Sequence, residues 1–386
     1  MPVITEIEDL RRLAKRRVPK MFYDYADSGS WTEQTYRDNE SDFDKIYLRQ
    51  KVARNMEGRS LATTMIGQEV SMPVAIAPTG LTGMQHADGE ILAAQAAQEF
   101  GVPFTLSTMS ICSIEDVAEN TSKPFWFQIY VMRDRDFAGR LIDRAKAAGC
   151  SALVVTLDLQ ILGQRHKDIK NDLGNLKNPK AWLDIATKPR WCLGMAQTKR
   201  HDFGNIVGHV DGVDDPGSLM EWTASQFDPS LNWDDLEWIK DRWGGPIIVK
   251  GILDVEDAQK AAERGADAII VSNHGGRQLD GALSSITMLP QIVEAVGDKT
   301  EIHLDSGIRS GQHVLKALGL GAQGTYIGRA FLYGLGAMGK AGVTKALEII
   351  RHELDISMAF TGDTNIKDVG RKNLILPGDP EGFLPR

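Results

Sequence analysis

The chain has little of what disulfide-linked, metal-binding and membrane-spanning proteins depend on. Its 386 residues include three cysteines, Cys112, Cys150 and Cys192, and these lie too far apart to suggest a disulfide framework or a metal site. Such usage fits a reducing compartment. No stretch approaches the roughly 18 apolar residues of a membrane-spanning helix. The first residues, MPVITEIEDLRRLAKRR, lack the apolar centre of a signal peptide. We therefore expect a cytoplasmic location.

Basic residues do not outnumber acidic ones, since the chain has 44 Lys and Arg against 52 Asp and Glu. The formal net charge is −8, which argues against a general nucleic-acid binder. No histidines follow HExxH or a comparable ligand spacing, so we expect no metal. The hydrophobic fraction of 42% is enough for a substantial core.

What the chain does contain is a regular alternation of strand-like and helix-like segments. Helical patterns cover residues 5–20, 88–100, 114–119, 136–148 and 311–318, and a loop is expected over 21–30. Short apolar runs occur at 73–77, 103–107, 125–130, 152–158, 246–250, 267–272, 301–305 and 325–328. Eight strands alternating with helices predict an α/β protein with a (β/α)₈ TIM barrel, formed as a single domain over residues 1–386. A doubly wound sheet shows the same alternation and is the alternative.

Residues about 160–235 interrupt this alternation. The stretch is rich in Lys, Asp, Gly and Asn, and a long irregular segment at the rim of a barrel is typical of a lid-like loop. Part of it combines basic side chains with tryptophan, as in segments that rest on anionic membrane surfaces; that part holds Lys188, Arg190, Trp191, Lys199 and Arg200.

Polar side chains recur at the ends of the predicted strands. They are Gln128, Tyr130, Thr156, Asp158, Lys250, Ser272 and Asp305. In a parallel barrel such ends meet at one mouth, where the chemistry lies. His274 and Arg277 follow the sixth strand; a histidine can accept a proton near neutral pH, and an arginine can clamp a carboxylate. Asp158 can orient the imidazole, and Arg165 can join the clamp.

Lys250 has two interpretations that sequence spacing does not separate. It is either a positive charge beside an electron-accepting cofactor or a Schiff-base lysine. The loops after strands seven and eight each combine a glycine with an arginine, Gly307 with Arg309 and Gly328 with Arg329, which favours a phosphate site. Two GxGxxG matches, at 319–324 and 334–339, lack the strand-then-helix context of a dinucleotide site.

Several motifs together carry a family resemblance over nearly the whole chain. They include SNHGGRQLDG at 272–281, APTG at 77–80, FQIY at 127–130, VKGI at 249–252, and the later segments DSGIR and IGRAFLYGL. The chain resembles the FMN-dependent L-2-hydroxy-acid dehydrogenases and oxidases. Segments such as LRQKVARNM and FDPSLNWDDLEWI are most similar to the bacterial respiratory L-lactate dehydrogenase branch of that family.

The resemblance implies a specific activity. FMN would lie at the barrel mouth, and an L-2-hydroxy acid, L-lactate on this wording, would be oxidised to pyruvate with electrons passed to a quinone or another acceptor. His274 looks like the base and Asp158 its partner, with Arg277 and Arg165 on the substrate carboxylate. Tyr25 and Tyr130 would lie near the substrate. The matching cofactor positions are Ala77, Pro78, Thr79, Ser107, Gln128, Thr156, Lys250, Ser272, Asp305, Ser306, Gly307, Arg309, Gly328 and Arg329. A homotetramer with peripheral contact to the inner face of the cell membrane is also implied.

The chain departs from the family pattern in three places. Leu159 and Gln160 follow Asp158 where a proline is common, Met109 stands where glycolate oxidase has tryptophan, and Gly80 stands where several oxidases have alanine. These departures bear on substrate size and electron acceptor, and leave open an oxygen-using oxidase of the glycolate or mandelate type. A flavin-free Schiff-base lyase using Lys250, and a barrel that only binds a ligand, are the remaining alternatives.

Overall fold

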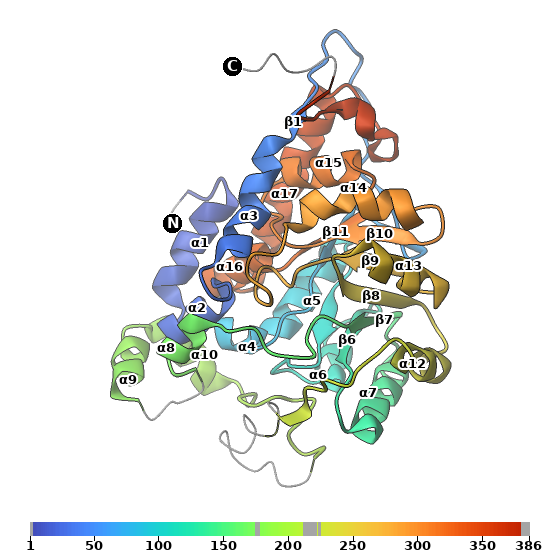
Figure 1. The fold of residues 1–386 in the computed structure, drawn as a ribbon. Helices are drawn as coiled ribbons and strands as arrows, with labels where there is room; N and C mark the ends of the chain where they lie inside the picture. The colour runs from blue at the N-terminus through green and yellow to red at the C-terminus, as the bar shows by residue number, and fades with distance from the viewer. Residues whose placement is uncertain (1–2, 174–177, 211–221, 223–224, 380–386) are drawn as a thin grey trace.

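The structure is a computed structural model that describes residues 3–173, 178–210, 222 and 225–379. Eight parallel strands are hydrogen-bonded in the order β4-β11-β10-β9-β8-β7-β6-β5. Figure 1 labels the strands from β6 to β11. The Ile76 N–H donates to the Pro103 carbonyl at 2.8 Å, which joins the two ends of the sheet. The predicted barrel is therefore confirmed, and the doubly wound alternative is wrong. The strands are β4 (Val74–Ile76), β5 (Thr105–Ser107), β6 (Trp126–Tyr130), β7 (Ala152–Thr156), β8 (Ile247–Ile252), β9 (Ala268–Val271), β10 (Glu301–Leu304) and β11 (Gly324–Ile327).

Some strand and helix limits differ from those expected. Strand β7 ends at Thr156, so Asp158 lies in the loop beyond it, whereas β8 continues past Lys250 through an irregularity at Gly251. The expected helix over 5–20 is two helices, α1 (Ile7–Arg17) and α2 (Lys20–Ala26), and the loop expected from residue 21 was wrong. Val18 is extended because a residue before proline is driven out of the helical region, and Pro19 is the N-cap of the second helix.

Helices surround the barrel and fix its carboxyl-end loops. Helix α1 packs on α16 (Arg329–Met338), and α16 packs closely on α17 (Lys340–Phe360). That approach needs glycine, because a Cβ added to Gly342 would lie 1.8 Å from the Gly334 carbonyl oxygen. The other helices include α3 (Gln34–Ser41), α4 (Thr82–Gln85), α5 (Gly89–Phe100), α6 (Ile114–Glu119), α7 (Arg135–Ala147), α12 (Asp235–Trp243), α13 (Val255–Glu263), α14 (Ser285–Val296), α15 (Gly311–Gly319), α16 (Arg329–Met338) and α17 (Lys340–Phe360).

The barrel interior is packed, and its amino-terminal end is closed. Trp126 and Tyr326 fill the centre with small and branched side chains from the other strands. A hairpin of β2 (Thr63–Met65) and β3 (Gln68–Val70) covers that end, with Met65 buried against Gly324. A further short pair, β1 (Tyr47–Leu48) with β12 (Leu374–Ile375), lies outside the barrel. The hairpin leaves the carboxyl-end mouth as the end where a ligand can enter.

The segment predicted as an irregular lid contains helices. They are α8 (His166–Lys170), α9 (Pro179–Ala186) and α10 (Pro189–Gln197), and α8 and α9 pack beside α2 at the edge of the molecule (Figure 1). Residues 174–177, 211–221 and 223–224 of this segment lie outside the described residues.

Two residues of the expected membrane-facing group turn inward instead. Trp191 stacks on Phe22 with ring centroids 5.7 Å apart, and Arg200 pairs with Asp88 and Asp116. Among the described residues, the longest and most apolar helices still fall short of what a bilayer crossing requires.

Candidate active site

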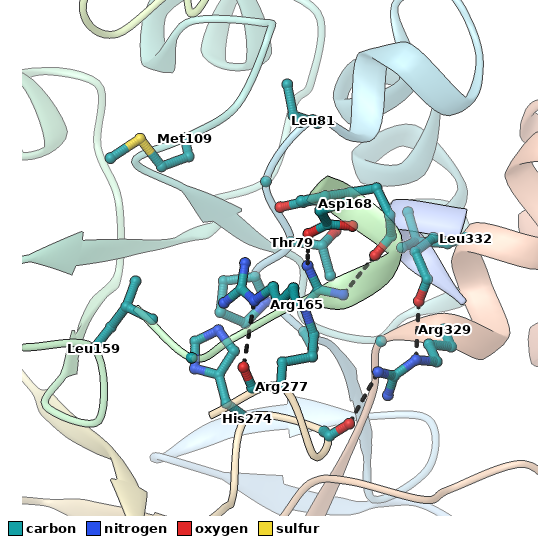
Figure 2. Close-up of a pocket in the computed structure, with 18 of the residues that line it drawn as sticks. Thr79, Leu81, Met109, Leu159, Arg165, Asp168, His274, Arg277, Arg329 and Leu332 are labelled. Atoms are coloured by element: carbon teal, nitrogen blue, oxygen red, sulfur yellow. Dashed lines mark hydrogen bonds and ion pairs between the residues drawn. The ribbon is translucent and has the colours of Figure 1, made fainter. Parts of the chain in front are cut away.

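A cavity of about 650 Å³ opens at the carboxyl ends of the barrel strands (Figure 2). Loops after the strands form its walls together with α2 and α8. Most of the predicted site residues line it: Tyr25, Ala77, Pro78, Thr79, Tyr130, Arg165, Lys250, His274, Arg277, Asp305, Ser306, Gly307, Arg309, Gly328 and Arg329. The remaining five, Ser107, Gln128, Thr156, Asp158 and Ser272, are buried or half-buried and are not among its lining residues. The structure thus gathers residues from segments far apart in sequence around one chamber.

His274 is held in a single orientation. Its Nδ1 lies 2.8 Å from Asp158 Oδ1, and its backbone N–H donates to Ser272 Oγ at 3.1 Å. If Nδ1 carries the proton of the neutral imidazole, Nε2 is left as the basic nitrogen. Burial lowers the pKa of His274, Asp158 partly offsets that effect, and the charge of Lys250 adds to it. A histidine with a lowered pKa is neutral at physiological pH and can accept a proton.

The position of Asp158 depends on Gly251 of β8, which has no side chain to occupy the same space. Burial favours a higher pKa for Asp158, but His274 and Lys250 outweigh it and hold the pKa below its ordinary value. A Cβ added to Gly251 would lie 2.5 Å from Asp158 Cγ, and Gly251 has φ +98°. Glycine therefore both adopts this backbone conformation and leaves room for the carboxylate.

Lys250 is a buried cation with fixed partners. Its Nζ lies 3.0 Å from Asp305 Oδ2 and donates to Ser272 Oγ at 2.9 Å. Burial alone would lower the pKa of Lys250, but Asp305 and Asp158 raise it above its ordinary value. A Schiff-base lysine needs a neutral amine, usually obtained through a lowered pKa. The surroundings of Lys250 favour the other interpretation, a permanent positive charge in the cavity wall.

Two guanidinium groups face the same part of the cavity as His274 (Figure 2). Arg277 lies 4.6 Å above the Tyr25 ring, and its Nη1 donates to the carbonyls of Tyr25 and Ser28. Arg165 Nε donates to the Arg277 carbonyl at 3.3 Å. Arg277 Nη2 makes no hydrogen bond within the described residues. Arg277 Nη2 lies 3.7 Å from Asp168 Oδ2, beyond ordinary hydrogen-bonding distance, and a planar guanidinium with such an edge is suited to an anionic ligand such as a carboxylate.

A second set of polar groups lies on β5, β6 and β7. Gln128 Oε1 accepts hydrogen bonds from Ser107 Oγ at 3.0 Å and from the Thr108 N–H at 3.3 Å. Gln128 Nε2 and Thr156 Oγ1 are buried and have no partner among the residues that the structure describes. Buried polar atoms usually have a partner, so these two groups on adjacent strands are available to a ligand with polar edges.

The loops after β10 and β11 form the far end of the cavity. Ser306 and Gly307 both have positive φ, and a Cβ on Gly307 would lie 1.8 Å from the Asn39 carbonyl oxygen. Arg309 pairs with Glu40 at 2.8 Å, while Arg329 donates to the carbonyls of Ala26, Ser28 and Gly275. Helix α16 begins at Arg329, so its amino terminus points at this end.

Comparison with known proteins agrees with this geometry. A family described as FMN-dependent dehydrogenase matches residues 14–376. The chain belongs to this family. It is 46% identical over 375 residues to an L-lactate dehydrogenase of Azorhizobium caulinodans, covering 97% of this chain and 99% of that protein. It is 45% identical over 369 residues to the L-lactate dehydrogenase of Ectopseudomonas mendocina, covering 95% and 97%.

Solved structures give the same fold. The monotopic membrane protein (S)-mandelate dehydrogenase superposes with a TM-score of 0.93 at 35% identity, covering 97% of this chain and 100% of that one. A mandelate oxidase solved with (S)-2-phenylpropionate gives 0.81 at 32% identity, covering 97% and 98%. The resemblance found in the sequence is thus confirmed, and so is FMN as the cofactor of the family.

The residues present fit FMN. Gln128 Nε2 and Thr156 Oγ1 are unpaired groups of the kind that the polar edge of a flavin ring would satisfy. Lys250 supplies a buried positive charge, which favours an electron-rich ring. The amino terminus of α16 and the loop at Gly307 offer backbone N–H groups to a phosphate.

Sequence reasoning missed two residues of this site. Asp168 of α8 lines the cavity, and the side chain of Gln278 joins the loops around it. Gln278 Nε2 donates to the Asp158 and Ile161 carbonyls, and its Oε1 accepts from Arg165. Gln278 stood inside the SNHGGRQLDG motif and could have been suspected. Asp168 stands three residues after Arg165, but the helix that turns it toward Arg277 was hidden in the supposed irregular segment.

Proposed function

We propose that this protein oxidises L-lactate to pyruvate with FMN as its cofactor and passes the electrons to a quinone. One observation carries the proposal: His274, held by Asp158 at 2.8 Å, lines the same cavity as two guanidinium groups. The identity of 45–46% to proteins named L-lactate dehydrogenase supports lactate as the substrate. We take residues 1–386 as one FMN-binding domain.

The proposed roles follow from the positions of the side chains. The substrate carboxylate binds Arg277 and Arg165, which orients the hydroxyl-bearing carbon toward His274. Neutral His274 removes one proton, from the hydroxyl or from the α-carbon, and Asp158 stabilises the imidazolium that results. FMN supplies the site that accepts the two electrons. Tyr25 and Tyr130 lie in the cavity wall beside the substrate.

The remaining predicted residues serve the cofactor in this proposal. Lys250 contributes positive charge at the ring and is held by Asp305 and Ser272. The ring edge is assigned to Ala77, Pro78, Thr79, Ser107, Gln128 and Thr156. The phosphate and ribityl end is assigned to Ser306, Gly307, Arg309, Gly328 and Arg329.

A larger L-2-hydroxy acid is the second candidate substrate. The cavity has an apolar wall far bigger than the methyl group of lactate, and the side chains of this wall are Leu81, Met109, Leu159, Leu162, Phe203 and Phe227. The solved relatives include enzymes named for mandelate. Gly80 keeps this region open, since a Cβ there would meet Tyr25 Oη at 3.1 Å and Met109 Cβ at 3.2 Å.

An anaerobic substrate panel tests the proposal. The purified yellow protein is mixed with L-lactate, D-lactate, glycolate and (S)-mandelate, and bleaching of the flavin absorbance is followed by stopped flow. We expect L-lactate to give the highest ratio of the rate constant for flavin reduction to the half-saturation concentration. Fastest reduction by mandelate would favour the second candidate, and no reduction by any L-2-hydroxy acid would refute both. If a soluble quinone reoxidises the reduced flavin faster than air does, this supports a quinone as the electron acceptor.

Membrane contact is proposed through α9 and α10. Trp182, Leu183 and Leu193 are 61%, 72% and 62% exposed, and the basic side chains of Lys180 and Arg190 lie among them. Apolar side chains flanked by basic ones favour an anionic lipid surface. We expect sedimentation with phosphatidylglycerol vesicles, lost in Trp182→Asp/Leu183→Asp and retained in Phe360→Asp, an equally exposed apolar position on α17. Equal binding by all three proteins would contradict this surface.

A homotetramer at the cytoplasmic face of the membrane completes the proposal. Light scattering coupled to size exclusion measures the mass directly. Four copies of the 42.5 kDa chain are expected, and a monomer at micromolar concentration would refute the assembly.

A further inference from the structure

Asp168 is a carboxyl group placed inside the proposed substrate site. It projects from α8 into the cavity, where its Oδ2 lies 3.7 Å from Arg277 Nη2 (Figure 2). Its Oδ1 and Arg277 Nη2 are both buried without a hydrogen bond among the described residues. The two side chains are 14% and 11% exposed. A negatively charged group beside the clamp for a negatively charged substrate requires an explanation.

Asp168 cannot easily withdraw, because α8 is tied down on both sides of it. Lys167 Nζ pairs with Glu33 at 2.9 Å and donates to the Asp27 carbonyl at 3.2 Å. Asn171 Nδ2 donates to Asp24 at 2.8 Å. The helix is therefore fixed against α2 and the segment that follows it, and Asp168 stays near Arg277 when a ligand arrives.

A substrate carboxylate at the free edge of Arg277 would then lie next to the Asp168 carboxylate. Two carboxylates in one buried site do not both ionise readily, and one of them gains a proton. We propose that Asp168 takes up one proton from solvent when the substrate carboxylate binds, and then donates a hydrogen bond to that carboxylate. This inference rests on the proposed function, because it needs the carboxylate on Arg277. No covalent bond changes except the new O–H bond of Asp168.

The charges around Asp168 agree with this role. Burial raises the pKa of Asp168 above its ordinary value, Arg277 and Arg165 oppose the rise, Asp24 adds to it and Lys167 opposes it. A bound anion would raise the pKa further. Between the pKa values of the free and liganded states, affinity for a carboxylate should fall as pH rises, by up to about tenfold per pH unit. Below both values Asp168 is already protonated, so affinity should not change there.

His274 also bears on the number of protons taken up. An anion in the cavity favours the imidazolium, so His274 can gain a fraction of a proton as well. Tyr25 and Tyr130 line the same cavity, and burial raises the pKa of Tyr130 still further above neutrality, so its hydroxyl does not titrate in this range. A variant of Asp168 must therefore be compared with the unchanged protein, which separates the two sources.

Calorimetry of the FMN-loaded protein tests the inference. Pyruvate, which does not reduce the oxidised flavin, is titrated at each pH from about 5 to 8 in buffers with different ionisation enthalpies, which yields the number of protons taken up per pyruvate. Asp168→Asn is compared with Asp241→Asn, an exposed site on α12. We expect wild type and Asp241→Asn to take up the same number of protons per pyruvate. Asp168→Asn should take up less than half of that number. The variant should also bind pyruvate more tightly than wild type at the alkaline end.

Three results would overturn the inference. They are equal proton uptake in wild type and Asp168→Asn, weaker binding by the variant at every pH, and no binding of pyruvate to wild type. Weaker binding throughout would mean that Asp168 acts as an ionised group orienting Arg277. Asp168→Ser replaces the asparagine variant if that one does not fold. Flavin bleaching by L-lactate is recorded on the same samples: its absence refutes the proposed function, whereas bleaching with unchanged proton uptake refutes the inference alone.

Discussion

Replacing Gly251 by alanine should disable the site, although Gly251 itself carries no reactive group. The added methyl would lie 2.5 Å from Asp158 Cγ, 2.6 Å from its Cβ and 2.9 Å from Oδ2. Such approaches are far inside van der Waals contact, so Asp158 must move. Its 2.8 Å contact with His274 would then break or lengthen. The imidazole would lose both its orientation and the carboxylate that stabilises its charged form.

The size of the effect can be estimated from these losses. Alanine at φ +98° costs about 1–3 kcal/mol of stability as backbone strain. Loss of an oriented general base lowers a rate by about 10²–10⁴. Because Asp158 raises the pKa of His274, its displacement should also lower the pKa seen in the pH profile of flavin reduction. We therefore expect a folded, yellow protein that is reduced by L-lactate at least about a hundredfold more slowly.

Anaerobic stopped flow measures this rate, and FMN content is measured on the same sample. Gly149→Ala is the matched control, since Gly149 has φ +74° but no atom within 4 Å of an added Cβ. The control should lose similar stability and keep its rate. A normal rate and pH profile in Gly251→Ala would mean that the Asp158–His274 contact does not matter for proton removal.

Three further predictions concern substrate, pH and stability. Arg277→Lys loses the planar fork and should weaken L-lactate binding and slow flavin reduction together, measured from the concentration dependence of stopped-flow rates; a change in neither would place the carboxylate elsewhere. The pKa of His274 is lowered by burial, so flavin reduction should be constant at neutral pH and decline only in acid below the ordinary histidine value; a decline beginning above pH 7 would contradict this. Asp27 is buried, pairs with the partly exposed Arg11 and accepts a hydrogen bond from the Tyr333 hydroxyl, so Asp27→Ala should lower the free energy of unfolding by about 1–3 kcal/mol in urea titration; an unchanged free energy of unfolding would contradict a stabilising role for this carboxylate.

The barrel could be predicted because the sequence patterns that indicate it lie within short segments of the chain. Each buried strand is a short apolar run, and several carry a polar residue near the carboxyl end, such as Gln128 on β6 and Lys250 on β8, so the order of segments already suggests a common mouth. His274 and Arg277 follow from the same logic. The identity of those side chains, together with a distinctive motif, was enough to indicate the chemistry.

The rest depended on contacts between distant segments. Asp168 belongs to the site because α8 packs against α2, and no local pattern records that contact. The need for glycine at Gly251 comes from Asp158, more than ninety residues earlier. Trp191 faces inward because its ring stacks on that of Phe22. Composition alone placed Asp168 and Trp191 in a polar, irregular stretch of the chain.

Anaerobic reduction of the bound flavin by L-lactate in wild type and in His274→Gln tests the central claim most directly. We expect rapid bleaching in wild type and a rate lower by about 10²–10⁴ in the variant, while dithionite bleaches both proteins equally. Bleaching of His274→Gln by L-lactate at the wild-type rate would show that His274 is not the base and would contradict the account.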